Sequence, residues 1–224
     1  MISFLSSKPK IILGSASSSR KKIMDDLASQ YGFNYTVKTA DIDEKAIRFQ
    51  DPHQLVLALG HAKRDAILSK LAAETSTSGS ISSSEDHNTN AYLITCDQVV
   101  VHGGRILEKP ENENECREFI RGYGESPAST VGSVVCTSLS TGRSYEEVDV
   151  SHIHIATIPE EVITKLVEEG ACMWCAGGLM IEHPLVSPYI QKIEGTEDGV
   201  RGLSKALVTK LLLEAQGHER SLSF

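Results

Sequence analysis

A near-continuous apolar run begins at Leu93 and reads L-I-T-C-D-Q-V-V-V-H-G-G-R-I-L-E-K-P as far as Pro110. It predicts a buried strand that ends at the glycines of H-G-G-R, then a hairpin and a return strand. Asp97 is the single acid before those glycines. An ionised carboxylate removed from water needs a cation, a metal or several donors, so Asp97 is a candidate site residue. The alternative is an exposed Asp at a strand end, and this stretch alone does not separate the two.

A second strand is predicted over residues 10–14, and it passes through S-A-S-S-S-R-K-K into an amphipathic helix. The apolar face of that helix carries Ile23, Met24 and Leu27. A helix N-terminus offers unpaired N–H groups and partial positive charge, and Arg20 with the next two lysines adds full charges. Ser15 and Arg20 therefore belong to a candidate phosphate site. The alternative is that a serine caps the helix while the basic residues face solvent.

Asp51 and Pro52 predict the start of a helix that runs to about Leu71. At about 100° per residue, its apolar stripe contains Leu55, Val56, Leu59, Ala62, Ala66 and Ile67. Lys63 falls inside this stripe. A lysine in such a position either extends its ammonium to the edge of the core or projects it into a cleft.

The composition changes sharply at residue 73. Residues 73–90 are rich in Ser and Thr without periodicity, which predicts a flexible surface loop inserted into a single domain, residues 1–224. Upstream of it, a short strand at 34–38 leads to A-D-I-D-E, which holds Asp41, Asp43 and Glu44. Three close acids could bind a hard cation through oxygen, but an acidic helix start has the same composition.

The second half of the chain predicts a succession of short regular elements. They are a helix at 112–123, an antiparallel pair of strands at 129–139 and 145–155, a helix at 160–169, a strand at 189–194, a G-T-E-D-G turn and a C-terminal helix. The last helix is expected to contain Leu203, Leu207, Leu211 and Leu212. His152 and His154 share a strand face, and without a third ligand ordinary strand positions are favoured over a metal site.

Composition limits the class of function. The 224 residues are 40% hydrophobic, enough for a substantial core, and the net charge of −8 argues against binding a nucleic-acid polymer. No stretch approaches the roughly 20 apolar residues of a membrane span, and the first ten residues contain too short an apolar run for a secretory signal. A cytoplasmic protein without membrane partners is expected.

The cysteines support the same compartment. There are five, irregularly spaced, which fits reduced thiols better than a disulfide framework. Cys172 and Cys175 form a single C-x-x-C between a helix and two glycines. A zinc ribbon needs a second such pair, and a thioredoxin-like site follows a strand and opens a helix. Ordinary thiols are favoured, with a redox or metal role as the alternative.

Several short motifs, taken in order, resemble the Maf family of nucleoside triphosphate pyrophosphatases. They are I-L-G-S-A-S-S-S-R-K-K from Ile12, D-I-D-E from Asp41, H-A-K ending at Lys63, C-D-Q-V-V from Cys96, E-K-P from Glu108, A-G-G from Ala176, and I-E-G followed by V-R-G-L from Val200. The resemblance covers nearly the whole chain outside the serine-rich loop. It implies a mixed α/β fold of the inosine-triphosphatase type, with an elongated sheet flanked by helices, two lobes around a cleft, and a homodimer.

The resemblance also implies roles for individual residues. Asp97 would be the general base that activates water, and Glu44 with Asp97 would hold Mg²⁺ or another divalent cation such as Mn²⁺. The triphosphate would be bound by Ser15, Arg20, Lys63 and Lys109. Attack at the α-phosphorus of a non-standard or modified nucleotide would release a nucleoside monophosphate and pyrophosphate.

Base preference is implied by positions that differ between subgroups of the family. Here they are Ser19, Gln98 and Glu182. An Asp followed by Gln resembles the subgroup acting on 7-methyl-GTP, whereas Thr is usual there in the dTTP and UTP subgroup; CTP is a further alternative. The chain departs from the family pattern at Ser18 and Ser204, where Pro is usual, and at Leu179 and Met180, where Tyr and Gly are common.

Two classes of function follow from these residues. The first is a Mg²⁺-dependent pyrophosphatase with a cleansing role. The second is a nucleotide-binding regulator of cell division without turnover, because the family is also associated with inhibition of septum formation. The presence of Asp97, Glu44 and Lys109 favours the enzyme, since a sensor needs no general base.

Overall fold

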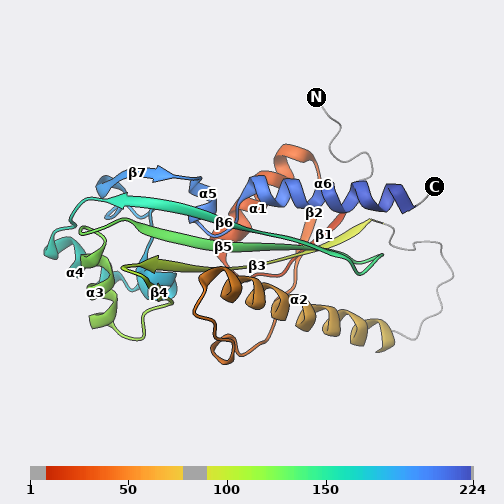
Figure 1. Cartoon of the computed structure of the whole chain (residues 1–224), viewed down its shortest axis with the longest axis horizontal. Coiled ribbons are helices and arrows are strands. Elements are labelled where there is room, and N and C mark those ends of the chain that lie inside the picture. Colours follow the sequence, from red (N-terminus) through yellow and green to blue (C-terminus); the bar gives the residue numbers. More distant parts are fainter. Residues whose placement is uncertain (1–8, 78–89, 223–224) are drawn as a thin grey trace.

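The computed structural model describes residues 9–77 and 90–222, which form a mixed α/β fold around one seven-stranded sheet (Figure 1). Its strands are β1 (Lys10–Leu13), β2 (Asn34–Val37), β3 (Ala91–His102), β4 (Arg105–Leu107), β5 (Ala128–Ser138), β6 (Ser144–Ile155) and β7 (Ile190–Glu194). Its helices are α1 (Ser18–Tyr31), α2 (Pro52–Thr77), α3 (Glu113–Gly122), α4 (Glu160–Glu169), α5 (Glu197–Val200) and α6 (Lys205–Leu222). The predicted fold class, a mixed elongated sheet flanked by helices, is confirmed.

The strand that carries Asp97 is central in the sheet. The strand order is β2-β1-β3-β5-β6-β7, and β4 pairs with the far part of β3. β1 is parallel to both β2 and β3, whereas β3, β4, β5, β6 and β7 pair in antiparallel fashion. Nearly every residue from 91 to 100 is buried, and Asp97 lies opposite Ser133 of β5. The apolar run at residues 93–102 is therefore explained by burial on both faces.

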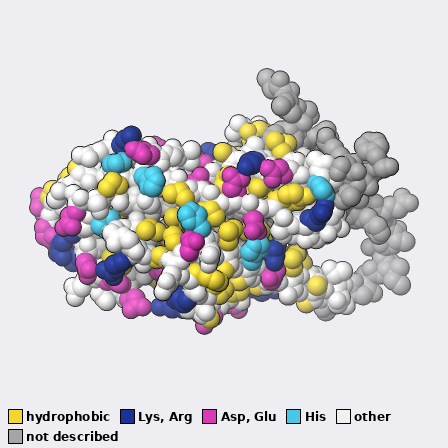
Figure 2. Space-filling model, viewed as in Figure 1, with side chains coloured by type: hydrophobic (Ala, Val, Ile, Leu, Met, Phe, Trp, Pro, Cys, Tyr) yellow, Lys and Arg dark blue, Asp and Glu magenta, His cyan; other side chains and the backbone are white. Residues whose placement is uncertain are grey.

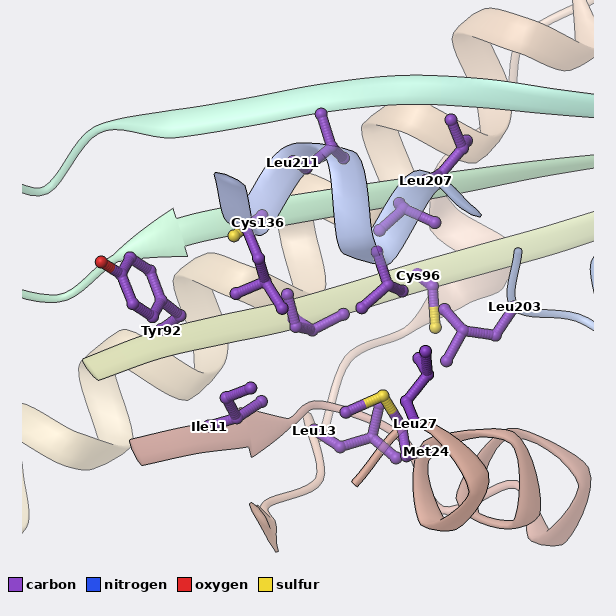
Figure 3. Close-up of a cluster of buried hydrophobic side chains, with 14 of the residues drawn as sticks. Ile11, Leu13, Met24, Leu27, Tyr92, Cys96, Cys136, Leu203, Leu207 and Leu211 are labelled. Carbon is purple, nitrogen blue, oxygen red and sulfur yellow. The ribbon is translucent and has the colours of Figure 1, made fainter. Parts of the chain in front are cut away.

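Alternation along β3 decides which helix each side chain meets, because successive side chains of a strand point to opposite faces. One face, drawn in Figure 3, carries Tyr92 and Cys96 against α1 and α6. The opposite face meets α2, where the Thr95 hydroxyl donates to the Gly60 carbonyl at 2.9 Å and Val99 packs on apolar residues of the helix. Asp97 belongs to this second set of side chains, so it faces α2.

The apolar core is divided along the sheet. One cluster joins α1 and α6 to β1, β3 and β5, and a second joins α3 and α4 to the region between α4 and β7. Figure 1 shows these two pairs of helices near different ends of the sheet. A smaller cluster under the first turns of α2 lies beside the middle of β3. Among the described helices, none combines the length and the apolarity that crossing a membrane requires.

Two of the predicted helix boundaries are wrong. α2 continues to Thr77 rather than ending near Leu71, because the hydroxyls of Thr75 and Ser76 donate to carbonyls one turn back and remain compatible with the helix. The predicted loop at 73–90 is thus helical as far as residue 77, and residues 78–89 lie outside the described part of the chain, as do residues 1–8 of the N-terminal stretch.

The C-terminal helix also begins later than predicted. Leu203 is buried beside Leu207, but α6 starts at Lys205. Ser204, in place of the usual Pro, accepts a hydrogen bond from the backbone N–H of Leu207 at 3.4 Å and so caps the helix. The predicted G-T-E-D-G turn contains the single-turn helix α5, whose N-cap is Thr196.

Surface charge is mixed on the face drawn in Figure 2. Among the described residues on that face, Lys and Arg side chains are interspersed with Asp and Glu rather than gathered into a stripe. The cations that matter for the site are instead brought together by the fold inside a cleft.

Candidate active site

The centre of the site is an ammonium group held between two carboxylates. Asp97 on β3 is 9% exposed and Lys63 on α2 is 8% exposed. The Lys63 ammonium donates to Oδ1 of Asp97, and it lies 2.8 Å from Oε1 of Glu44. Lys63 reaches Asp97 because the apolar stripe of α2 and the Asp97 face of β3 are packed together. The lysine therefore projects into the site rather than extending to the edge of the core.

These contacts shift the pKa values of both Glu44 and Lys63. Burial acts to raise the pKa of Glu44, but the hydrogen bond and charge of Lys63, with the charges of Lys109 and Arg20, outweigh it and hold the pKa below its usual range. Burial acts to lower the pKa of Lys63. The charge of Asp97 and the hydrogen bonds to both carboxylates outweigh burial and the repulsion from Arg20, so the pKa of Lys63 is raised. At neutral pH the site holds a protonated lysine and an ionised Glu44.

The junction between β1 and α1 contributes hydroxyls and a guanidinium. Ser17 is the N-cap of α1 and accepts from the Arg20 backbone at 3.4 Å, while Oγ of Ser15 accepts from the Ser17 N–H at 3.2 Å. The Arg20 side chain is turned inward. Its Nη1 is 3.4 Å from the carbonyl of Cys96, the residue before Asp97. A serine therefore does cap the helix, and the same turn also places a cation beside Asp97.

A backbone segment, residues 199–202, connects the side chains of this junction to β3. The carbonyl of Gly199 accepts from Nε2 of Gln98 at 2.7 Å. The carbonyl of Arg201 accepts from the Ser19 hydroxyl at 2.9 Å, and the carbonyl of Gly202 accepts from Nε of Arg20 at 2.9 Å. This segment, which we call the carbonyl strap, fixes three side chains that sequence reasoning had placed in the site.

The carbonyl strap also brings in Arg201, which sequence reasoning did not single out. Its Nε is buried without a hydrogen-bond partner among the described residues, and it lies 4.0 Å from Oε1 of Glu182. The V-R-G-L motif contained a signal, because Gly202 has φ of 110°, a backbone region that glycine adopts far more easily than other residues. The contacts themselves span up to 182 positions in sequence, so no local pattern predicts them.

These groups surround one cleft with a volume of about 980 Å³. All of the predicted site residues line it, namely Ser15, Ser19, Arg20, Glu44, Lys63, Asp97, Gln98, Lys109 and Glu182. Lys109 is exposed and follows β4, and Glu108 before it pairs with Arg48 at 3.2 Å. The lining also includes Lys45, Arg48, Phe49 and Trp174, which the sequence analysis had not named. The cleft can hold a molecule the size of a nucleoside triphosphate, with its phosphates near the cations.

The donor set fits a divalent cation only in part. Glu44 and Asp97 supply carboxylate oxygens, which suit Mg²⁺ and Mn²⁺, and magnesium commonly takes one or two carboxylates beside substrate phosphates. Among the described residues, no group of three or more His, Cys, Asp and Glu side chains could hold a metal. Asp43 instead caps the 3₁₀ turn Glu44–Ala46. The three acids near residue 43 therefore do not form a metal site by themselves.

The cysteines are described as free thiols. Sγ of Cys172 lies 3.4 Å from Sγ of Cys116, on α3. Burial and the neighbouring Cys172 raise the pKa of Cys116 to about 12, and burial with the charge of Glu182 raises the pKa of Cys175 to about 11. Because the thiolate is the reactive form, these two groups are poorly suited to redox chemistry at neutral pH.

Comparison with known proteins gives a consistent result. The family described as "Maf-like protein" matches residues 10–215. The chain is 36% identical over 208 residues to a protein of Dictyostelium discoideum named 7-methyl-GTP pyrophosphatase, covering 93% of this chain and 98% of the relative. It is 27% identical over 206 residues to a protein of Salinispora tropica named nucleoside triphosphate pyrophosphatase, covering 92% of this chain and 83% of the relative. A relative of the same name from Thermosynechococcus vestitus is 26% identical over 203 residues, covering 90% of this chain and 91% of the relative.

Proposed function

The chain belongs to the Maf family, and we propose that it is a nucleoside triphosphate pyrophosphatase that converts its substrate and water into a nucleoside monophosphate and pyrophosphate. The observation that carries the proposal is the buried contact of Asp97 with Lys63 inside a cleft that also holds Arg20 and Ser15. A protein that only binds nucleotides needs the cations but has no use for a buried carboxylate at their centre.

In this proposal Asp97 is the general base. Lys63 contacts Oδ1 of Asp97, and a water on Oδ2 would give up its proton as its oxygen attacks the α-phosphorus. The bond from the α-phosphorus to the bridging oxygen breaks, and pyrophosphate leaves with its electron pair. A carboxylate suits this role because its free oxygen can accept the proton that the attacking water gives up.

The cations of the cleft would bind and orient the triphosphate. Arg20 is held by the carbonyl strap and Lys63 by the two carboxylates, so both present fixed positive charge without reorganisation. Lys109, which is exposed, would contact the outer phosphates. Charge that develops on the leaving pyrophosphate is thereby stabilised.

A divalent cation would complete this arrangement. Glu44 and Asp97 would hold Mg²⁺, or Mn²⁺, together with phosphate oxygens, and the bound cation would neutralise phosphate charge. We further propose that Ser19, Gln98 and Glu182 select the base, with a 7-methyl-GTP-like substrate ahead of dTTP, UTP or CTP. The resemblance to the family and the reduced cysteines support a cytoplasmic homodimer whose two lobes flank the cleft.

The experiment that tests the function is pyrophosphate release from a panel of nucleoside triphosphates. 7-Methyl-GTP, GTP, dTTP, UTP and CTP are compared with Mg²⁺, with Mn²⁺, and with a chelator. We expect metal-dependent release with the largest kcat/KM for 7-methyl-GTP, and almost none with the chelator. Tight binding of these nucleotides without release from any of them would instead support the nucleotide-binding regulator.

Gly202→Ala tests whether the carbonyl strap positions Arg20. At the φ of 110° of Gly202, an added Cβ would lie 3.1 Å from Nε of Arg20 and 3.5 Å from Oε1 of Gln98. The Arg20 side chain must give by a few tenths of an ångström. Since a misplacement of about 1 Å can cost roughly a hundredfold, this smaller shift should cost less. We expect kcat/KM to fall by up to about tenfold in the pyrophosphate assay.

The matched control is Gly142→Ala, in the β5–β6 turn. Gly142 also has positive φ, 71°, but nothing lies within 4 Å of an added Cβ. Backbone strain should lower the free energy of unfolding of both variants by about 1–2 kcal/mol. Only Gly202→Ala should also lower kcat/KM. Equal kcat/KM in the two variants would show that the strap does not position the catalytic groups.

A further inference from the structure

A large aromatic side chain stands exposed at the cleft. Trp174 is the single tryptophan of the chain, its exposed fraction is 78%, and it lines the same cleft as Lys63 and Asp97. Tryptophan is highly buried on average in folded proteins, so such exposure within a binding cleft indicates a ligand contact. Phe49, 45% exposed, lines the cleft as well.

The backbone that presents Trp174 is firmly held. Trp174 is the last residue of the 3₁₀ turn Ala171–Trp174, and one residue separates that turn from the A-G-G turn. The N–H of Gly177 donates to the carbonyl of Glu108 at 2.8 Å, and the Tyr123 hydroxyl donates to the carbonyl of Gly177 at 2.6 Å. An added Cβ at Gly177 would lie 2.3 Å from that hydroxyl oxygen. The turn that follows Trp174 is therefore anchored, and a fixed backbone beside the indole lowers the entropy cost of stacking.

Near Trp174 the cleft carries one negative and one positive side chain, Glu182 and Lys109, which could bind a base edge and a phosphate respectively. Cys175, the residue after Trp174, feels the negative charge of Glu182, which together with burial raises its pKa, and the positive charge of Lys109, which acts the opposite way. Glu182 and Lys109 line the same cleft as Trp174. The Glu182 carboxylate can accept the N–H groups of a guanine edge.

We propose that Trp174 is the stacking platform for the nucleobase and that it selects a cationic purine of the 7-methylguanine class over a neutral base. The inference rests on the proposed function, which it extends to the base subsite. Alkylation of N7 gives the purine ring a positive charge, and the negative face of an indole attracts a cation stacked over it. GTP has the same edge for Glu182 but lacks this charge, which strengthens both the stacking on Trp174 and the contact with Glu182. Replacing Trp174 removes the first contribution and leaves the second.

The single tryptophan provides a direct measurement that needs no turnover. Fluorescence of the Asp97→Asn protein is titrated with 7-methyl-GTP, GTP and inorganic tripolyphosphate. We expect saturable quenching by 7-methyl-GTP at about tenfold lower concentration than by GTP, consistent with a cation–π contribution. Tripolyphosphate should compete with 7-methyl-GTP while leaving the fluorescence unchanged when added alone. Displacement of tripolyphosphate by 7-methyl-GTP without any change in fluorescence would overturn the proposal.

Variants separate the base subsite from the chemistry. Trp174→Ala should raise KM for 7-methyl-GTP about tenfold or more with a small change in kcat, and should reduce the preference for 7-methyl-GTP over GTP. Trp174→Phe should restore most of that preference. Leu213→Ala, an exposed apolar residue of α6 that does not line the cleft, is the control. An unchanged preference in Trp174→Ala would overturn the proposal.

The outcomes also distinguish this inference from the proposed function. Quenching by 7-methyl-GTP in a protein that releases no pyrophosphate would support the base subsite and refute the hydrolase. Release of pyrophosphate, with fluorescence that does not change when nucleotide is added, would support the hydrolase and refute the base subsite. Fluorescence that depends on protein concentration and not on nucleotide would show that a second copy of the chain covers Trp174, and would overturn its assignment to the base.

Discussion

Asp97→Asn is expected to reduce pyrophosphate release about a thousandfold, within the range by which general bases accelerate reactions. The amide keeps the shape of the carboxylate and can still accept a hydrogen bond from Lys63, so the fold and the cleft should survive. It cannot take a proton from water. The loss should therefore appear in kcat, while the Kd for nucleotide measured by calorimetry changes little.

The control for this variant is Asp65→Asn, an exposed acid of α2 that pairs with its neighbour Arg64 and does not line the cleft. Its activity should match that of the unaltered protein. If Asp97→Asn retained full turnover, Asp97 would have no part in proton transfer, and Glu44, the other carboxylate on the Lys63 ammonium, would become the candidate base.

The sequence was sufficient to find the two residues at the centre because each one breaks an apolar pattern. Asp97 interrupts a buried strand and Lys63 interrupts a helical stripe, and periodicity places each on a defined face. Their meeting requires only that the apolar faces of α2 and β3 pack together. The patterns alone left each residue with a second interpretation, and only the resemblance to the Maf family placed both in one site.

What could not be predicted depends on contacts between distant segments. The carbonyl strap acts through backbone oxygens of residues 199–202, which any sequence would supply, so side-chain patterns gave no indication of it. Trp174 was not predicted as a site residue, because the stretch A-C-M-W-C was interpreted only through its two cysteines. Its exposed fraction of 78% is a property of the folded chain that no local pattern indicates.

Lys63→Met is expected to destabilise the protein by about 3 kcal/mol at neutral pH, because breaking a buried ion pair leaves its partner charges without compensation. The Asp97 side chain is only 12% exposed, so its unpaired charge would account for most of this cost. The Glu44 side chain is 48% exposed, so water would solvate its charge. Methionine preserves the helix and the apolar stem, so the loss reports the ammonium. Turnover should also fall, by about a hundredfold, since a preorganised phosphate contact is removed.

The pH dependence of this loss has a defined sign. The folded-state pKa of Glu44 is lowered, so its contribution to stability is present above the unfolded pKa and is lost as pH falls through the folded value. The folded-state pKa of Lys63 is raised, so its contribution is present below the unfolded pKa and is lost as pH rises through the folded value. The difference in unfolding free energy between Lys63→Met and the unaltered protein, measured in urea, should be largest between these limits and shrink in acid.

A double-mutant cycle decides whether the lost stability belongs to the Lys63 contact with Asp97. Once Asp97→Asn has removed the buried negative charge, Lys63→Met no longer leaves an uncompensated carboxylate there, so the double variant should be more stable than the sum of the single losses predicts. Lys22→Met, which removes an exposed ammonium from α1, should change stability little in either background. Additive losses would mean that the ammonium and the carboxylate are not energetically coupled. The pairing with Lys63 would then have to be abandoned as the reason that a carboxylate can be buried in β3.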